Sequence, residues 1–196
     1  MAKVKLQGVR LSFPDLFEAV QYEGQGPFKY RASFLFEPNS DSHKALLAAM
    51  KEVAEEAWKD KAKSILAKAD DDSKLRFIID GNKKEYDGYK DMLAISATRD
   101  QAKGRPMVLN KKPKNPDGTP NFVTQTDGVV YGGCYVNATV ELWAQNNKYG
   151  KTIRAQLLAV QFVKDGDAFG GGSAKGSPDD FEDLSDTGED DDLISE

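Results

Sequence analysis

Six cationic side chains fall within one short stretch of this 196-residue chain, between residues 99 and 114. The stretch has one acid, Asp100, and a net charge of +5; its cations are Arg99, Lys103, Arg105, Lys111, Lys112 and Lys114. Its glycine and prolines predict a long exposed loop around a short strand at 106–109. Such a loop can neutralise several phosphates of a nucleic acid and release their counterions, which gives affinity without sequence preference. The alternative is a solvated loop whose lysines only aid solubility.

Two aromatic residues, Tyr135 and Trp143, lie on the polar face of a strand predicted at 134–145, whose other face is uniformly apolar. Proteins that bind single strands combine a cationic groove with aromatic rings on which bases stack. More candidates for such a groove lie on the next hairpin and on an earlier predicted strand: Lys148, Tyr149, Lys151, Arg154, Lys29 and Arg31. The alternative is that Tyr135 and Trp143 pack beneath a helix.

The residues that carry catalysis or hold metals in most enzymes are scarce. With one His (His43) and one Cys (Cys134), the chain has neither an internal disulfide nor the ligands of a cysteine zinc site. The acids at 70–72 lack the spacing of a calcium loop, and the glycines at 170–172 lack the Lys of a phosphate loop. Glu141 is the only acid inside a clearly alternating strand. We therefore expect a non-enzymatic protein without cofactor or metal.

The formal net charge of −5 conceals two parts of opposite sign. Residues 1–164 contain 26 basic and 20 acidic residues, a net of +6, whereas residues 165–196 contain 12 acidic residues and one Lys, a net of −11. This asymmetry suggests a body that binds nucleic acid and a tail that interacts with partners. The alternative is a tail that only improves solubility.

A glycine-rich segment at 169–178 separates these two parts. It is typical of a flexible linker, and the acidic segment beyond it has too few apolar residues to form a core. We predict a folded domain at 1–167 and a disordered linker and tail at 168–196. The chain has no apolar run long enough to span a membrane and no apolar leader, which together with its single Cys favours the cytoplasm.

Alternating and helical patterns define the expected elements. Strands are predicted at 3–17, 27–37, 75–79, 92–98, 134–145 and 152–163, in addition to 106–109, and one helix at 42–68. Gly8 lies where the apolar parity of the first strand switches, which indicates a β-bulge. Residues 146–150 predict a hairpin turn, and the stripe of Phe28, Tyr30, Phe34 and Phe36 should be mostly core.

These elements predict a mainly β (α+β) fold: an OB-fold-like barrel of five strands with one long inserted helix. An open α+β sheet is the alternative. The OB-fold places oligonucleotides on its face and loops, in agreement with the positions of the cations and rings.

Several short motifs carry a family resemblance over most of 1–168. They are the FPDLF run at 13–17, YRASFLF at 30–36, Arg105-Pro106, YGGCYVNA at 131–138 and VQFVKDG at 160–166. The most specific of these motifs is YGGCYVNA, which is similar to a Y-x-G-C-Y-V-x-A pattern at the entrance of a strand. The chain thereby resembles the OB-fold single-stranded-DNA-binding proteins of tailed bacteriophages, a family first catalogued as a phage domain of unknown function.

The resemblance implies a protein that coats exposed strands during replication or recombination, with a tail that recruits other proteins. Tails of this kind often end in an aromatic residue, but this chain ends in Asp192-Leu193-Ile194-Ser195-Glu196. Partner contacts would then fall on other tail residues, namely Phe181, Asp190, Asp191, Asp192, Leu193 and Ile194. Two alternatives stay open: a strand-annealing or general DNA-binding protein that also holds duplex, and an acidic-tailed chaperone.

Overall fold

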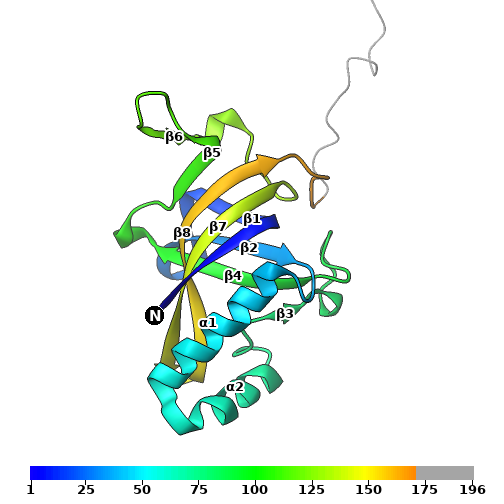
Figure 1. The fold of residues 1–196 in the computed structure, drawn as a ribbon, viewed down its shortest axis with the longest axis vertical. Helices are drawn as coiled ribbons and strands as arrows, with labels where there is room; N and C mark the ends of the chain where they lie inside the picture. Colours follow the sequence, from blue (N-terminus) through cyan, green and yellow to red (C-terminus); the bar gives the residue numbers. More distant parts are fainter. Residues whose placement is uncertain (171–196) are drawn as a thin grey trace, which may run out of the picture.

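Eight strands and two α-helices form within residues 1–170, the part of the chain that the computed structural model describes (Figure 1). The strands are β1 (Ala2–Tyr22), β2 (Gln25–Phe36), β3 (Ile79–Asp80), β4 (Leu93–Asp100), β5 (Met107–Lys114), β6 (Pro120–Phe122), β7 (Tyr135–Asn147) and β8 (Gly150–Lys164). The helices are α1 (Asp41–Trp58) and α2 (Ala62–Asp71), with short 3-10 turns at Lys59–Lys61, Gly81–Lys83, Gln101–Lys103 and Gln125–Asp127. The predicted acidic tail, from 171 onward, lies outside the described residues.

Five of the strands pair in a closed ring. The sheet runs in the order β3-β4-β2-β1-β7-β8-β5-β6, and a parallel pairing of β4 with β8 joins its two halves. In that pairing Ala97 lies opposite Ala155 and Thr98 opposite Gln156. The ring β1-β2-β4-β8-β7 is the five-stranded, OB-like barrel that the sequence predicts. The alternative of an open sheet is wrong, because β4 and β8 close the ring.

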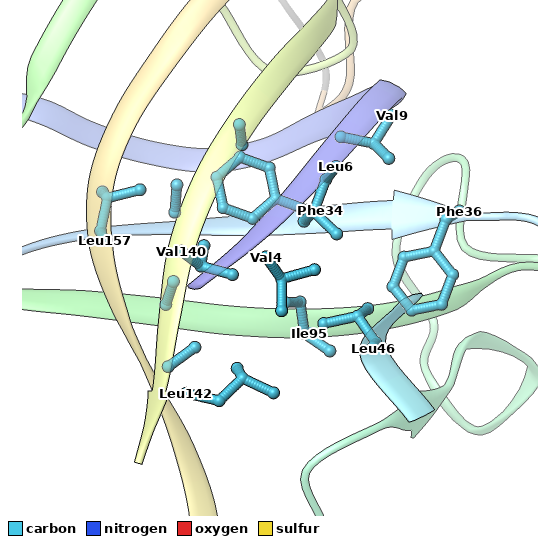
Figure 2. Close-up of a cluster of buried hydrophobic side chains, with 14 of the residues drawn as sticks. Val4, Leu6, Val9, Phe34, Phe36, Leu46, Ile95, Val140, Leu142 and Leu157 are labelled. Atoms are coloured by element: carbon cyan, nitrogen blue, oxygen red, sulfur yellow. The ribbon is translucent and has the colours of Figure 1, made fainter. Parts of the chain in front are cut away.

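One face of each strand fills the barrel with apolar side chains (Figure 2). Residues that are at most 4% exposed include Val4, Leu6, Phe34, Ile95, Val140, Leu142 and Leu157. Full burial of one such side chain stabilises the fold by about 1.5–3 kcal/mol. The bulge predicted at Gly8 is confirmed: the residue has a φ of 60°, and the pairing of β1 with β7 shifts register between Leu6 and Val9.

The aromatic stripe of β2 is only half buried. Phe34 and Phe36 belong to the core, Tyr30 is partly buried, and Phe28 is 45% exposed. The expectation of a mostly buried stripe fails at Phe28, because this end of β2 pairs with β1 near the β1–β2 turn, where Val20 lies opposite Lys29. The apolar alternation of β2 continues into this end of the strand, so the sequence does not show where the β1–β2 hairpin extends beyond the barrel and its side chains become exposed.

The predicted single helix at 42–68 is instead two helices. Ser40 caps α1, its hydroxyl accepting a hydrogen bond from the His43 amide at 3.3 Å, and Leu46 and Val53 pack into the core against β1 and β7. The helix ends at Lys59, which has a φ of 49°, and α2 starts at Ala62. The apolar spacing continues across this break, and Lys is not a usual residue at a positive φ.

The segment predicted as a strand at 75–79 is mostly irregular. Only Ile79 and Asp80 pair with β4. Phe77 is buried in the core, and the backbone carbonyl of Leu75 accepts a hydrogen bond from the Thr152 hydroxyl. The segment therefore packs on the barrel without joining its sheet.

Residues 81–92 and 165–170 cover one part of the outer wall. Leu35 and Ala94, on the outer face of β2 and β4, form a second small core with Tyr89, Met92 and Phe169. The Phe169 amide donates to the Gly132 carbonyl at 2.8 Å, and the Gly170 amide to a carboxylate oxygen of Asp87 at 2.9 Å. Contacts of this segment therefore continue to Phe169 and Gly170, and the predicted domain boundary at 167 stays a prediction.

Outside the ring, β5 and β6 form a hairpin that projects from the barrel (Figure 1). The first residues of β5, Met107 to Leu109, pair with β8 in parallel. The strand continues to Lys114, beyond the predicted end at 109, because β6 pairs with its second half. The basic stretch is therefore a β-arm rather than a loop for much of its length.

Candidate nucleic-acid interface

A row of register partners crosses the outer wall of the barrel. Arg31 of β2 lies opposite Thr98 of β4, Thr98 opposite Gln156 of β8, and Gln156 opposite Glu141 of β7. Directly opposite residues point to the same face of a sheet, and neighbouring strands lie about 4.8 Å apart, so the row spans about 14 Å. The closure of β4 on β8 is what makes this row continuous.

One hollow lies over the junction of β4 and β8, and we call it the seam hollow. Its volume is about 330 Å³, and its lining is Met1, Lys29, Thr98, Asp100, Lys103, Glu141, Trp143 and Gln156. Lys103 donates to the side-chain oxygen of Gln156 at 2.6 Å, and Lys29 forms an ion pair with Asp100 at 3.4 Å. Trp143 is 38% exposed, so its ring lines this hollow instead of packing beneath a helix.

A second hollow, the aromatic hollow, lies next to the first over β2 and β4. Its volume is about 480 Å³, and its lining is Phe13, Arg31, Ala32, Ser33, Ile79, Lys84, Tyr86, Tyr89, Ser96 and Thr98. Thr98 lines both hollows. The two therefore form one continuous surface, the outer track, with exposed rings at both ends. Four cationic side chains of the described chain lie along it, and the acids Asp100 and Glu141 lie beside two of them in the seam hollow.

Two of the predicted cations have structural hydrogen bonds that occupy their guanidinium groups. Arg99 donates to the carbonyls of Gly104 and Lys103, both at 2.8 Å, and so holds the turn after β4. Arg154 donates to the Lys74 carbonyl at 2.9 Å, and burial lowers its pKa. Arginines that satisfy backbone carbonyls support the fold first, so these two are weaker candidates for phosphate contacts.

The other predicted cations are spread over the track and two hairpins. Arg31 forms an ion pair with Asp15 at the edge of the aromatic hollow. Exposed cations follow along the β5 arm and its approach: Arg105, Lys111, Lys112 and Lys114. The β7–β8 hairpin presents Lys148, Tyr149 and Lys151, with the Lys148 ammonium 5.0 Å from the Tyr149 ring centroid.

The two aromatic candidates of β7 do not lie together. Tyr135 is eight residues from Trp143, or about 26 Å along a strand, and is half buried. The Arg10 guanidinium lies 5.3 Å and the Lys164 ammonium 4.7 Å from its ring centroid. Tyr135 therefore belongs to the end of the barrel where Phe169 docks, and its role in binding stays a prediction.

The sequence did not single out Phe13, Lys84 and Tyr86 as candidate site residues. Lys84 and Tyr86 lie in a polar segment that the sequence predicts as a connecting loop. The Lys-Lys-Glu-Tyr run at 83–86, with cations next to an aromatic residue, is the one sequence feature that could have indicated a binding role for this segment. Phe13 is 49% exposed although its strand is largely buried. The tail candidates from Phe181 to Ile194 lie outside the described residues.

Residues 1–170 contain no group of three or more His, Cys, Asp or Glu side chains that could hold a metal ion. Cys134 is fully buried, and burial is the main cause that raises the pKa of its thiol. In the described part of the chain no helix is long and apolar enough to cross a membrane.

Comparison with known proteins gives consistent matches. A family model described as "Enterobacter phage Enc34, ssDNA-binding protein" matches residues 2–194. Protein p50 of Acyrthosiphon pisum secondary endosymbiont phage 1 is 43% identical over 185 residues, which cover 93% of this chain and 94% of p50.

Solved structures show a similar fold. The single-stranded DNA-binding protein from bacteriophage Enc34 in complex with ssDNA has a TM-score of 0.61 and 28% identity, and the match covers 86% of this chain and 89% of that one. A C-terminal truncation of the same phage protein gives 0.59 and 27%, over 85% and 88%. Gp2.5 of bacteriophage T7, a single-stranded DNA-binding protein, gives 0.51 and 14% over both full chains, a likeness in fold alone. The resemblance predicted from the motifs is thus confirmed: the chain belongs to the Enc34 family of phage ssDNA-binding proteins.

Proposed function

We propose that this protein binds single-stranded DNA along the outer track, without sequence preference and without catalysing a reaction. The continuity of the track carries the proposal: Thr98 lines both hollows, so a strand can pass from the rings at Phe13 and Tyr86 to Trp143 without leaving the wall. Membership of the Enc34 family supports it, since the structure from Enc34 was solved with ssDNA bound.

The chemistry of the track favours unpaired strands. Lys84 and Lys103 offer ammonium groups to phosphates, which every sequence shares. Exposed rings offer a stacking surface to bases, and every base has a π-face. In a duplex these faces are stacked on neighbouring bases, so the rings add affinity for single strands only.

The biological setting follows from the family and from the tail. We infer a role in phage DNA replication or recombination, in the cytoplasm of the host cell. Gly170, the last described residue, lines a hollow together with Phe13 and Tyr86. In this proposal the tail competes with DNA as a tethered polyanion and contacts partner proteins when DNA displaces it.

The lysines of the β5 arm favour a second candidate function. They lie on a projecting hairpin outside the ring, where they could also contact a duplex. In that case the protein would be a general DNA-binding or strand-annealing protein, and its affinity for duplex would be within a few-fold of that for single strands.

A titration of the full chain with labelled oligo-dT and with duplex of equal length, at several salt concentrations, tests the proposal. We expect tight binding of oligo-dT, weaker binding of duplex and a steep loss of both with salt. Equal affinities would support the general DNA-binding protein. The absence of any binding at low salt would refute both and favour the acidic-tailed chaperone.

A further inference from the structure

Phe13 and Tyr86 form an exposed aromatic ridge on the outer wall. Their ring centroids lie 5.0 Å apart with an interplanar angle of 76°, an edge-to-face contact, and the side chains are 49% and 50% exposed. The ridge rests on Tyr89, whose ring lies 5.3 Å from Tyr86 and which is only 4% exposed. The Tyr89 hydroxyl donates to the Ser12 hydroxyl at 3.3 Å. The exposed rings therefore stand on a fixed base, which limits the ordering cost of binding.

The backbone holds Phe13 outward at an energetic cost. Its φ is 47°, in the left-handed region that bulky residues rarely adopt, and the β1–β2 pairing shifts register between Ser12 and Asp15. Ser12 directly before it and Leu16 three residues after it are buried. A large apolar ring that the backbone strains to expose gains little for the fold, and strain of this kind gathers at binding sites.

The two sides of the ridge differ in charge. On one side lies the aromatic hollow, with Lys84, which has no ion pair within residues 1–170, and with Arg31 in its ion pair with Asp15. The same hollow holds the hydrogen-bonded hydroxyls of Ser33 and Ser96, which lie 2.9 Å apart. On the other side lies a hollow of about 400 Å³ that Glu85, Asp87 and Phe169 line. A phosphate is attracted to the first side and repelled from the second.

We infer that the aromatic ridge is a stacking site for one unpaired nucleobase. The base lies against Phe13 and Tyr86, and the phosphate beside it lies on the side of Arg31 and Lys84. From there the strand continues over Thr98 into the seam hollow. This inference rests on the proposed function and assigns the ridge as one end of the bound strand.

Substitution of Tyr86 tests the inference, because this exposed side chain can be removed with little effect on the core. We expect Tyr86→Ala to weaken binding of oligo-dT by about 5- to 150-fold, the usual loss for one stacked base, and Tyr86→Trp to retain or increase the affinity. Leu47→Ala on α1 is the matched control, since Leu47 is 47% exposed; it should bind like the wild type.

An abasic scan then locates the contact. An oligo-dT of the shortest length that binds fully is made with one abasic residue, moved along the strand in turn. At one terminal position the abasic residue should weaken binding of the wild type and have no further effect on Tyr86→Ala. The inference would be overturned if the losses caused by the abasic residue and by Tyr86→Ala added in full at every position. It would also be overturned if Tyr86→Ala bound oligo-dT as tightly as the wild type. Neither result would affect the proposed function, which fails only if the wild type does not bind single strands.

Discussion

The lysines of the β5 arm can be tested by the variant Lys111→Ala/Lys112→Ala/Lys114→Ala. All three side chains are exposed, and within residues 1–170 no carboxylate lies in ion-pair contact with them. On single strands the logarithm of the binding constant falls with the logarithm of salt by about 0.7 per phosphate neutralised. Loss of three contacts should therefore flatten the slope by about 2. Between 50 and 200 mM salt, a difference of about 2 between the slopes of wild type and variant changes the ratio of their affinities by about 16-fold.

The ion pairs of the outer track predict a smaller effect there. Asp100 already offsets the charge of Lys29 at 3.4 Å, so Lys29→Ala should flatten the slope by less than about 0.7. Fluorescence anisotropy with labelled oligo-dT at several salt concentrations measures both slopes. Removal of three exposed lysines in and before α2, in Lys61→Ala/Lys63→Ala/Lys68→Ala, is the control of equal charge. An unchanged slope in the arm variant, or equal flattening in the control, would refute phosphate contacts by the arm.

Three further measurements address other parts of the molecule. Trp143→Ala should lose about 1–3 kcal/mol of binding free energy, and oligo-dT should quench the tryptophan fluorescence of the wild type; unquenched emission would remove Trp143 from the track. Deletion of residues 171–196 should raise affinity for oligo-dT at low salt, where screening is weak, and equal affinity of both forms would exclude competition by the tail. The buried Cys134 thiol has a raised pKa, so its alkylation near pH 8.5 should be far slower in the folded than in the denatured protein. Because the unfolded thiol loses its proton first, stability should also fall as pH rises above about 8.5; a constant free energy of unfolding from pH 8 to 9.5 in the wild type would contradict this.

The barrel itself was largely predictable from periodicity. The alternation of Val136, Ala138, Val140 and Leu142 indicated which face of β7 lies inside, and all four are at most 3% exposed. The parity switch at Gly8 indicated the bulge in β1. These features could be predicted because a strand with one buried face must repeat every second residue, whatever it pairs with.

The helix break and the roles of the arginines were beyond local patterns. Lys59 lies between two helices that share one apolar spacing, and nothing in that spacing indicates its φ of 49°. Arg99 and Arg154 look like surface cations in the sequence, but Arg99 donates to the Lys103 and Gly104 carbonyls of the turn that follows it. Arg154 donates to the Lys74 carbonyl, which only the fold brings near. An arginine and a backbone carbonyl that accepts its hydrogen bond from 80 positions away share no pattern that a single sequence could reveal.

The aromatic ridge was missed for a related reason. Tyr86 lies in a polar segment that reads as a connector, and its contact with Phe13 joins residues 73 positions apart. The track emerges only when the 81–92 segment docks on the outer face of β2 and β4 through Tyr89 and Met92. Composition could suggest nucleic-acid binding, whereas the location of the site required the fold.

The joint between β4 and β8 has a consequence for the motions of the protein. Only two residue pairs, Ala97 with Ala155 and Thr98 with Gln156, connect these strands in the described chain, whereas β7 and β8 pair along thirteen positions. Such a short ladder should open locally at a lower free energy than the rest of the barrel, and its amides should exchange hydrogen sooner. A DNA strand on the outer track would hold both sides of this joint. Binding would then slow hydrogen exchange most at the amides of β4 and β8. The bound strand would stabilise the closed barrel against local opening at this joint.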